Sequence, residues 1–207
     1  MPVARCDSIG TQKHMNNTYV VMRHGQSLAN VAGIILSNRE EGKKNGYTLS
    51  PEGEEQVRRS VSHSKENGVL DKNVVIISSP FSRCVRTAEI AKEVLGVDRD
   101  IIIDERLRER WFGDWEKMSD GNYGEVWADD ARDPSHTIAN VESVRAVQER
   151  ALALLGDLES RFGGKTILLV SHGDVLQFLQ TGLQERLPAP RRDIPPLKTA
   201  EVRKIEI

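Results

Sequence analysis

The run ILLVSHG at residues 167–173 decides the fold, because a buried strand passes there directly into polar residues. Its apolar residues do not alternate with polar ones, which is typical of a strand buried on both faces of a parallel sheet. Two further runs have the same form, YVVMRHG at 19–25 and VVIISSP at 74–80. The sequence therefore predicts a sheet of mostly parallel strands covered by helices.

Helical patterns separate these strands. Ser50, Pro51 and Glu52 provide an N-cap, a proline at the first helical position and an acid in the first turn. The predicted helices span about 51–66, 81–96, 142–162 and 173–182, and short strands are predicted at 101–103 and 200–207. Strands that alternate with helices predict an α/β fold, a three-layer sandwich around the sheet.

The chain is predicted to consist of a flexible N-terminal leader, residues 1–17, and a single domain, residues 18–207. The leader has no apolar stretch of the kind found in secretory signals. Two long, mostly aperiodic insertions interrupt the domain at 31–48 and 111–141. The second insertion holds half of the aromatic residues, including all three tryptophans. It is either a lid or binding loop, or a helical subdomain that packs on the sheet.

Composition excludes several classes of protein. The 207 residues include 29 Lys and Arg and 31 Asp and Glu, so the net charge of −2 argues against a nucleic-acid-binding protein. No apolar run approaches the ~20 residues of a membrane-spanning helix. Two cysteines exclude a disulfide framework and indicate a reducing compartment, so we expect a cytoplasmic protein that does not bind membranes.

Polar residues follow each of the three long strands. Arg23 and His24 follow the first, Arg83 lies one helical turn beyond the second, and His172 follows the last. Because ligands bind outside the carboxyl ends of parallel strands, these side chains are expected to meet at one edge of the sheet. Helix N-termini add backbone N–H groups there. Such a cluster suits a phosphate dianion.

Two other interpretations of the histidines are open at this point. Each histidine could be an ordinary hydrogen-bonded loop residue. A zinc or iron site is the second alternative, because histidine is a common metal ligand. However, the spacing places no third or fourth ligand, and Arg23 beside His24 disfavours a cation. We therefore expect neither a metal nor another cofactor.

Four motifs resemble those of a known family. They stand in order as VVMRHGQSLAN at 20–30, SSPFSRCVRTAEIA at 78–91, ERLRERWFGDWE at 105–116 and LLVSHGDVLQFL at 168–179. With these motifs the chain resembles the histidine phosphatase superfamily, which includes the cofactor-dependent phosphoglycerate mutases. The resemblance implies a phosphoglycerate mutase-like α/β domain around a mostly parallel sheet, with inserted segments that close over the pocket.

The resemblance also implies a role for individual residues. His24 takes the phosphoryl group as nucleophile, and Glu109 is the general acid and base. The phosphate oxygens are bound by Arg23, Asn30, Arg83 and His172. The same motif offers other carboxylates, and position within it favours Glu109 over Glu105, Asp114 and Glu116.

The expected chemistry sets conditions on both catalytic residues. A neutral imidazole must attack the phosphorus in line with the leaving oxygen, so one ring nitrogen of His24 must keep its proton. A backbone carbonyl near Gly25 would fix that tautomer. Burial of Glu109 would raise its pKa toward the working pH. Arginines supply the positive charge, so the reaction needs no metal.

Hydrolysis is favoured over phosphoryl shuffling between positions of a substrate. The insertion 31–48 contains no tryptophan, and LRERWFGDWE is more similar to the phosphatase branch of the family. Lys117 stands where glycine is usual, and Ala29 where tryptophan is usual. The alternatives are a phosphoglycerate mutase-type phosphotransferase and a non-catalytic protein that binds a phosphorylated ligand.

The expected partner is a small phosphorylated substrate, and no nucleic acid. Arg39, Lys43 and Lys44 in the first insertion are candidates to reach a second phosphate or carboxylate of that substrate. The aromatic-rich insertion could favour a sugar, a nucleoside or an aryl group, or only form the pocket wall. An exposed strand at 200–207 could pair with a second copy of the chain, which would give a homodimer.

Overall fold

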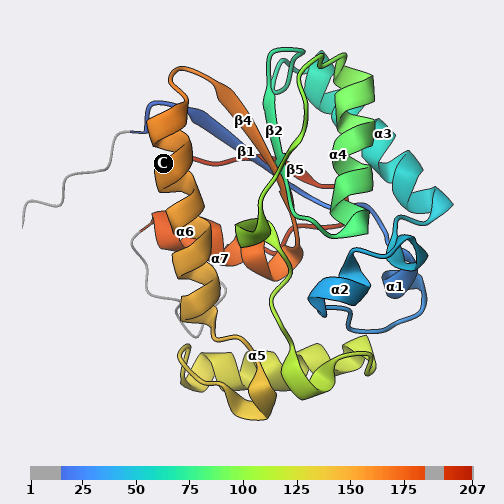
Figure 1. Ribbon diagram of the computed structural model, residues 1–207, viewed down its shortest axis with the longest axis vertical. Coiled ribbons are helices and arrows are strands. Elements are labelled where there is room, and N and C mark those ends of the chain that lie inside the picture. The colour runs from blue at the N-terminus through green and yellow to red at the C-terminus, as the bar shows by residue number, and fades with distance from the viewer. Residues whose placement is uncertain (1–14, 185–193, 207) are drawn as a thin grey trace, which may run out of the picture.

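One five-stranded sheet forms the centre of the molecule (Figure 1). The computed structural model describes residues 15–184 and 194–206. The strand order is β3-β2-β4-β1-β5, and only β5 runs antiparallel to its neighbour. The strands are β1 Thr18–Arg23, β2 Val75–Ser78, β3 Ile102–Ile103, β4 Thr166–Ser171 and β5 Val202–Lys204. The predicted mostly parallel sheet is confirmed.

Helices cover both faces of this sheet, as the two sides of Figure 1 show. One face packs against α3 (Pro51–Glu66) and α4 (Ser82–Leu95). The other face packs against α6 (Val144–Arg161) and α7 (Gly173–Leu183). The fold is therefore the predicted three-layer α/β sandwich.

Alternation of the side chains along β1 builds the two layers of core. Val20 and Met22 belong to the apolar cluster under α3 and α4, whereas Tyr19 and Val21 belong to the cluster under α6 and α7. All four are almost completely buried. A strand with apolar residues on both faces is what a sheet covered on both sides requires.

The predicted helix ends agree with the structure. The Ser50 hydroxyl accepts a hydrogen bond from the Gly53 N–H across 3.0 Å at the start of α3. Gly96 ends α4 with φ of +73°, a left-handed conformation that glycine adopts without steric cost. The predicted buried face of α6 is also confirmed: Val144, Val147, Ala151, Leu154, Leu155 and Leu158. Phe162 follows the last turn and is half-buried.

Short helices occupy the two insertions that looked aperiodic. α5 (Tyr123–Arg132) lies outside the sandwich, beyond the carboxyl ends of the parallel strands (Figure 1). Its neighbour Phe112 is buried with Ile35 and Val141 in a separate small apolar cluster. The other short elements are α1 Leu28–Val31, α2 Arg39–Gly42, and the 3-10 turns Asn45–Tyr47, Glu105–Leu107, Gly113–Trp115, Asp120–Asn122 and Ile138–Asn140.

The predicted leader spans residues 1–17, and its first 14 residues lie outside the described residues. The Asn16 N–H and the Asn17 amide donate to the Glu159 carboxylate across 2.7 and 2.8 Å, so contacts with the end of α6 begin there. The division into a leader and a single domain stays a prediction. In the part of the chain that the structure describes, no helix is long and apolar enough to cross a membrane.

Candidate active site

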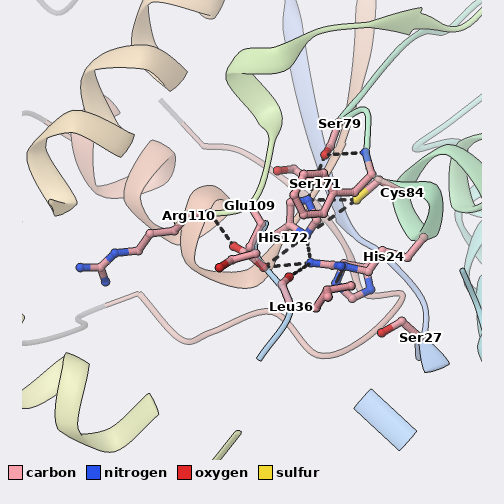
Figure 2. Close-up of polar contacts among 12 residues, drawn as sticks. His24, Ser27, Leu36, Ser79, Cys84, Glu109, Arg110, Ser171 and His172 are labelled. Carbon is pink, nitrogen blue, oxygen red and sulfur yellow. Dashed lines mark hydrogen bonds and ion pairs between the residues drawn. The ribbon is translucent and has the colours of Figure 1, made fainter. Parts of the chain in front are cut away.

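Two histidines meet at the carboxyl edge of the sheet because their strands are neighbours. β1 and β4 are paired in parallel with Arg23 opposite Ser171, so His24 and His172 follow paired positions. Their ring centroids lie 5.2 Å apart. Figure 2 shows both rings with Glu109, which comes from a separate segment, directed into the same cluster. The predicted convergence of polar side chains at one sheet edge is therefore found.

His24 is held as a neutral imidazole with a defined tautomer. Its Nδ1 donates to the Gly25 carbonyl across 2.7 Å, so the lone pair lies on Nε2. This is the tautomer predicted for an attack by His24. Burial, followed by the positive charge of Arg83, keeps the pKa of His24 well below its usual value.

Arg83 links the three other side chains of the cluster. It lies buried in the first turn of α4. Its Nε donates to His24 Nε2 across 3.1 Å, and its Nη2 lies 3.1 Å from His172 Nδ1 and 3.4 Å from Glu109 Oε2. Nη2 also donates to the Leu36 carbonyl across 3.0 Å, which fixes the guanidinium from the first insertion.

Two guanidinium groups keep buried N–H donors for a further acceptor. Arg23 donates from Nη1 to the Leu197 carbonyl across 2.9 Å, and its Nε has no partner among the described residues. Nη1 of Arg83 also has none there. Buried donors of this kind are rare and costly. Their presence beside His24 indicates an oxyanion-binding site.

His172 is completely buried as the N-cap residue of α7. Its Nε2 lies 2.9 Å from the Ser79 hydroxyl, and its Nδ1 lies 3.2 Å from Glu109 Oε2. Burial, and then the charge of Arg83, lower its pKa well below the usual value. Cys84 Sγ lies 3.5 Å from Nε2, and burial raises the thiol pKa to about 12. The Cys84 thiol therefore stays protonated and is no competing nucleophile.

Glu109 has an environment that favours its protonated form. Burial raises its pKa, although the nearby Arg83 charge and a hydrogen bond oppose the shift. That hydrogen bond comes from the Arg110 N–H to Glu109 Oε1 across 2.9 Å. The shift has the direction that a general acid needs.

The other carboxylates of the same motif point elsewhere. Glu105 is exposed and forms an ion pair with Lys43 at 3.0 Å. Asp114 is exposed and accepts from the Asn140 amide across 2.9 Å. Glu116 accepts two hydrogen bonds from Ser37, both across 2.7 Å. Of the four carboxylates, Glu109 is the one that the structure brings to the histidines.

Asn30 is the predicted site residue that does not join this cluster. Its Oδ1 accepts from the Ser27 N–H across 3.0 Å and from the Ser27 hydroxyl across 2.9 Å, which closes a capping box on α1. No hydrogen bond connects it to His24, Arg83 or His172 within the described segments. Its amide nitrogen is the group left for a phosphate oxygen.

Sequence reasoning missed one residue of the site, Ser79, and one buried residue that supports it, Arg110. Ser79, which contacts His172, was marked only by its place after a buried strand. Arg110 is completely buried and directed away from the histidines (Figure 2). It forms two hydrogen bonds of 2.7 Å with Asp130 and donates to the Glu142 carbonyl across 2.7 Å. The one sequence signal for Arg110 was its position directly after Glu109 in the acid motif.

A hydrogen bond between Ser37 and Glu116 joins the two insertions beside the site. Ser37 donates to Glu116 and accepts from the Phe112 N–H across 3.0 Å. Lys117 follows with φ of +63°, the left-handed conformation that explains why glycine is usual at this position. Its N–H donates to the Ile35 carbonyl across 2.8 Å.

The basic residues of the first insertion are directed mainly to neighbouring carboxylates. Lys43 pairs with Glu105, and Lys44 pairs with Glu41. Arg39 is exposed on α2. Contact of these three residues with a substrate stays a prediction. Across residues 15–184 and 194–206, no group of three or more His, Cys, Asp or Glu side chains is arranged to hold a metal ion.

Comparison with known proteins identifies the family. The family model described as "Histidine phosphatase superfamily (branch 1)" matches residues 19–207. A 2,3-bisphosphoglycerate-dependent phosphoglycerate mutase of Parvibaculum lavamentivorans is 29% identical over 173 residues, which cover 80% of this chain and 79% of that protein. An uncharacterized phosphatase of Bacillus subtilis is 28% identical over 161 residues, 78% of this chain and 74% of that protein.

A solved structure has the same fold. The native structure of a mycobacterial glucosyl-3-phosphoglycerate phosphatase superposes with a TM-score of 0.72 at 22% identity, covering 89% of this chain and 88% of that one. The chain belongs to the histidine phosphatase superfamily. The prediction of an enzyme of this superfamily with phosphatase relatives is confirmed.

Proposed function

We propose that this chain hydrolyses small phosphomonoesters through a phosphohistidine on His24, with Glu109 as general acid and then general base. The observation that supports this proposal is the protonation state and tautomer of His24. The imidazole is buried and neutral, and its Nδ1 proton is tied to Gly25, so the lone pair lies on Nε2. That lone pair accepts a hydrogen bond from Arg83 Nε, which the phosphoryl group must displace before Nε2 attacks phosphorus.

The oxygens of a bound phosphoryl group would accept hydrogen bonds from buried donors that have no other partner among the described residues. Nε of Arg23 and Nη1 of Arg83 are the buried donors without a partner among the described residues. His172 lies beside these donors, with its Nδ1 3.1 Å from Nη2 of Arg83, and its ring would complete the phosphate site. The amide of Asn30 adds a hydrogen bond. Fixed donors of this kind stabilise the charge that spreads over the equatorial oxygens in the transition state.

The reaction proceeds in two balanced steps. In the first, a bond forms between His24 Nε2 and phosphorus, the ester P–O bond breaks, and the Glu109 proton passes to the leaving alkoxide. In the second, ionised Glu109 takes a proton from water, the water oxygen bonds to phosphorus, and the N–P bond breaks. Inorganic phosphate leaves, and both residues return to their starting states.

The test is turnover of p-nitrophenyl phosphate with EDTA present, by the wild type and by His24→Ala. We expect wild-type turnover and a loss of at least about 10³-fold in the variant, because no other nucleophile replaces the imidazole. Equal turnover by both proteins contradicts the assignment. Activity that disappears only with EDTA would favour a metal site instead.

Phosphoryl transfer between positions of a substrate is the second candidate, and the relative named as a phosphoglycerate mutase favours it. A mutase needs the phosphohistidine to be protected from water. Incubation with 3-phosphoglycerate and a bisphosphoglycerate primer separates the two functions. Isomerisation faster than phosphate release would replace the hydrolase proposal with the mutase. A protein that binds phosphate but has neither activity would be a non-catalytic binding protein.

The proposal also covers the cellular location, substrate class and oligomeric state of the enzyme. A cytoplasmic location is supported by the free, buried Cys84 thiol, since reduced cysteines are usual there. The substrate is a small phosphate ester and not a nucleic acid, in accord with the net charge of −2. The β5 edge is the surface through which we propose a homodimer, and light scattering of the purified protein tests it.

A further inference from the structure

The two carboxyl oxygens of Glu109 have different partners. Oε1 accepts a hydrogen bond from the Arg110 N–H across 2.9 Å. Oε2 lies 3.2 Å from Nδ1 of His172 and 3.4 Å from Nη2 of Arg83. Because the backbone donor occupies Oε1, Oε2 is the oxygen that reaches the reacting groups. The position of the backbone at residue 110 therefore determines which oxygen of the acid faces the histidines.

The side chain of Arg110 fixes that stretch of backbone. It is completely buried and directed away from the histidines (Figure 2). Its Nη1 and Nη2 each donate to Asp130 of α5 across 2.7 Å, and its Nε donates to the Glu142 carbonyl across 2.7 Å. An arginine that binds a carboxylate through two parallel hydrogen bonds fixes direction as well as distance. One side chain thus joins the acid motif to α5 and to the segment that precedes α6.

Arg110 also lies against the helix that follows the second histidine. Its Nη1 is 3.6 Å from Oδ2 of Asp174, in the first turn of α7, which begins directly after His172. Its guanidinium carbon lies 5.5 Å from the centre of the Phe112 ring in its own motif. The same cation therefore contacts the elements that carry the general acid and the second histidine.

Stability of the fold does not by itself account for a charge at this position. Removing a guanidinium from water is costly, and apolar residues that replace a buried ion pair are often neutral or stabilising. Apolar packing does not supply fixed directions of the kind that Arg110 makes to Asp130 and Glu142. Arg106 in the same motif also binds a carboxylate twice, on Asp104 across 2.9 and 2.7 Å, but it is partly exposed and has no hydrogen bond to Glu109 among the described residues.

We infer that Arg110 is a positioning residue for Glu109: its buried guanidinium, held by Asp130 and the Glu142 carbonyl, keeps Oε2 of the acid directed at the reacting groups. Arg110 takes no step of its own in the reaction and acts through Glu109. This inference rests on the proposed phosphatase function, to which it adds α5 as a support of the general acid.

Two variants break the buried pair from opposite ends, Arg110→Lys and Asp130→Asn. The readout is kcat/KM for benzyl phosphate and for p-nitrophenyl phosphate, because kcat/KM reports the step in which Glu109 protonates the leaving oxygen. We expect a loss of about 10²-fold with benzyl phosphate, the size expected for a group misplaced by ~1 Å. The loss with p-nitrophenyl phosphate should stay below about fivefold, since nitrophenolate leaves without a proton. Equal losses with both esters in both variants overturn the inference.

The pH profile separates positioning of the acid from a general structural role. Burial is the main cause of the raised pKa of Glu109, and a displaced carboxyl gains contact with water. The alkaline limb of kcat/KM should therefore move to lower pH in Arg110→Lys. The variant keeps the other charged and titratable groups that act on Glu109 or lie against it, namely Arg23, Arg83, Tyr123, Arg150 and His172. A limb at the wild-type position overturns the inference.

Inhibition by inorganic phosphate measures the rest of the site. The inhibition constant should stay within about twofold of the wild-type value in both variants, because Arg23, Arg83 and His24 are unchanged. A constant that rises in parallel with the loss of activity would make Arg110 a general support of the site and overturns the inference. Circular dichroism checks that each variant is folded, and Asp130→Asn carries the test if Arg110→Lys does not fold.

Arg106→Lys is the matched control, since it alters the other arginine–aspartate pair of the same motif. It should lower kcat/KM equally for both esters or not at all, and leave the alkaline limb in place. The double variant Arg110→Lys/Asp130→Asn should lose no more activity with benzyl phosphate than the more affected single variant, because both changes break one pair. A loss selective for benzyl phosphate in Arg106→Lys overturns the inference.

Infrared difference spectroscopy provides a readout that does not depend on turnover. The protonated carboxyl band of Glu109 is assigned by its absence in Glu109→Gln. Its titration should move to lower pH in Arg110→Lys and stay in place in Arg106→Lys. An unmoved titration in Arg110→Lys overturns the inference whether or not the protein is active. Absence of turnover of both esters by the wild type would instead contradict the phosphatase function.

Discussion

Arg83 donates a hydrogen bond from Nε to Nε2 of His24 across 3.1 Å, so the guanidinium fixes the orientation of the imidazole and holds its lone pair. The guanidinium is itself fixed by the Leu36 carbonyl, which accepts from Nη2. Because Nη1 has no partner among the described residues, the same side chain can hold the nucleophile and bind a phosphate oxygen.

Arg83→Lys should lower kcat/KM by about 10²-fold or more. Lysine keeps the positive charge but cannot donate to His24, Leu36 and phosphate at once, so the loss measures geometry and not charge. Steady-state kinetics on p-nitrophenyl phosphate gives the number. Arg86→Lys, one turn further along α4 and paired with Glu54 near the surface, is the matched control. A wild-type rate in Arg83→Lys would contradict the role of the planar fork.

Glu109→Gln should lower kcat by about 10²–10⁴-fold for an alkyl phosphate and far less for p-nitrophenyl phosphate. An alkoxide needs a proton to leave, whereas nitrophenolate does not. The measurement is the ratio of the two losses in the same variant. Equal losses with both esters would assign Glu109 a structural role.

The pH profile of the wild type follows from the directions of the pKa shifts. The lowered pKa of His24 keeps it neutral and reactive below pH 6.5, so activity persists into mildly acidic solution. Glu109 acts as an acid only when protonated, so its raised pKa sets an alkaline limb on which kcat falls as pH rises. With an alkyl ester, Glu109→Gln should lose this limb. A limb of unchanged position in the variant would contradict the assignment.

Lys117→Gly should stabilise the protein. A non-glycine residue in the left-handed region costs roughly 1–2 kcal/mol, and the greater freedom of glycine in the unfolded chain offsets part of that gain. We expect a rise in Tm of about 2–4 °C by calorimetry. The Lys117–Glu41 pair that is lost is exposed and contributes little. Lys72→Gly, at an exposed turn position without positive φ, should not raise Tm.

Asp130→Asn should destabilise the protein by about 3 kcal/mol. Asp130 forms two hydrogen bonds of 2.7 Å with Arg110, whose side chain is completely buried, and without that carboxylate the cation keeps the more distant Asp174 carboxylate at 3.6 Å. Urea denaturation measures the change. Asp129→Asn is the control, since its partner Arg132 is largely exposed and the expected change is below about 0.5 kcal/mol. Similar results for both variants would contradict a structural role of the buried pair.

The sandwich itself was predictable because its signals are local. Continuous apolar runs mark β1, β2 and β4, and the Ser50 cap and the Gly96 turn mark helix ends. Alternation of strands and helices then leaves few topologies. The same logic brought His24 and Arg83 to one edge of the sheet.

The second insertion was less predictable because α5 is short and buries little of its own surface. Val126 is its one fully buried residue, and its aromatic side chains are stabilised by Phe112 and Asp174 from outside the helix. Arg110 is buried for a similar reason, since its neutralising carboxylate on Asp130 lies far along the chain. Contacts between distant segments, unlike local periods, leave no regular trace in a sequence.

The pairing of β1 with β4 has a consequence for biosynthesis. These strands come from opposite ends of the chain, and the Arg23–Ser171 register sets His24 beside His172. While β4 is still inside the ribosome, the emerged part of the chain therefore contains His24 but cannot yet place His172 beside it. Such long-range pairing forms late, after the costly closure of a long loop. Phosphate-ester turnover by a nascent chain should begin only when β4 has paired with β1. The onset of enzymatic activity therefore reports the completion of the central sheet.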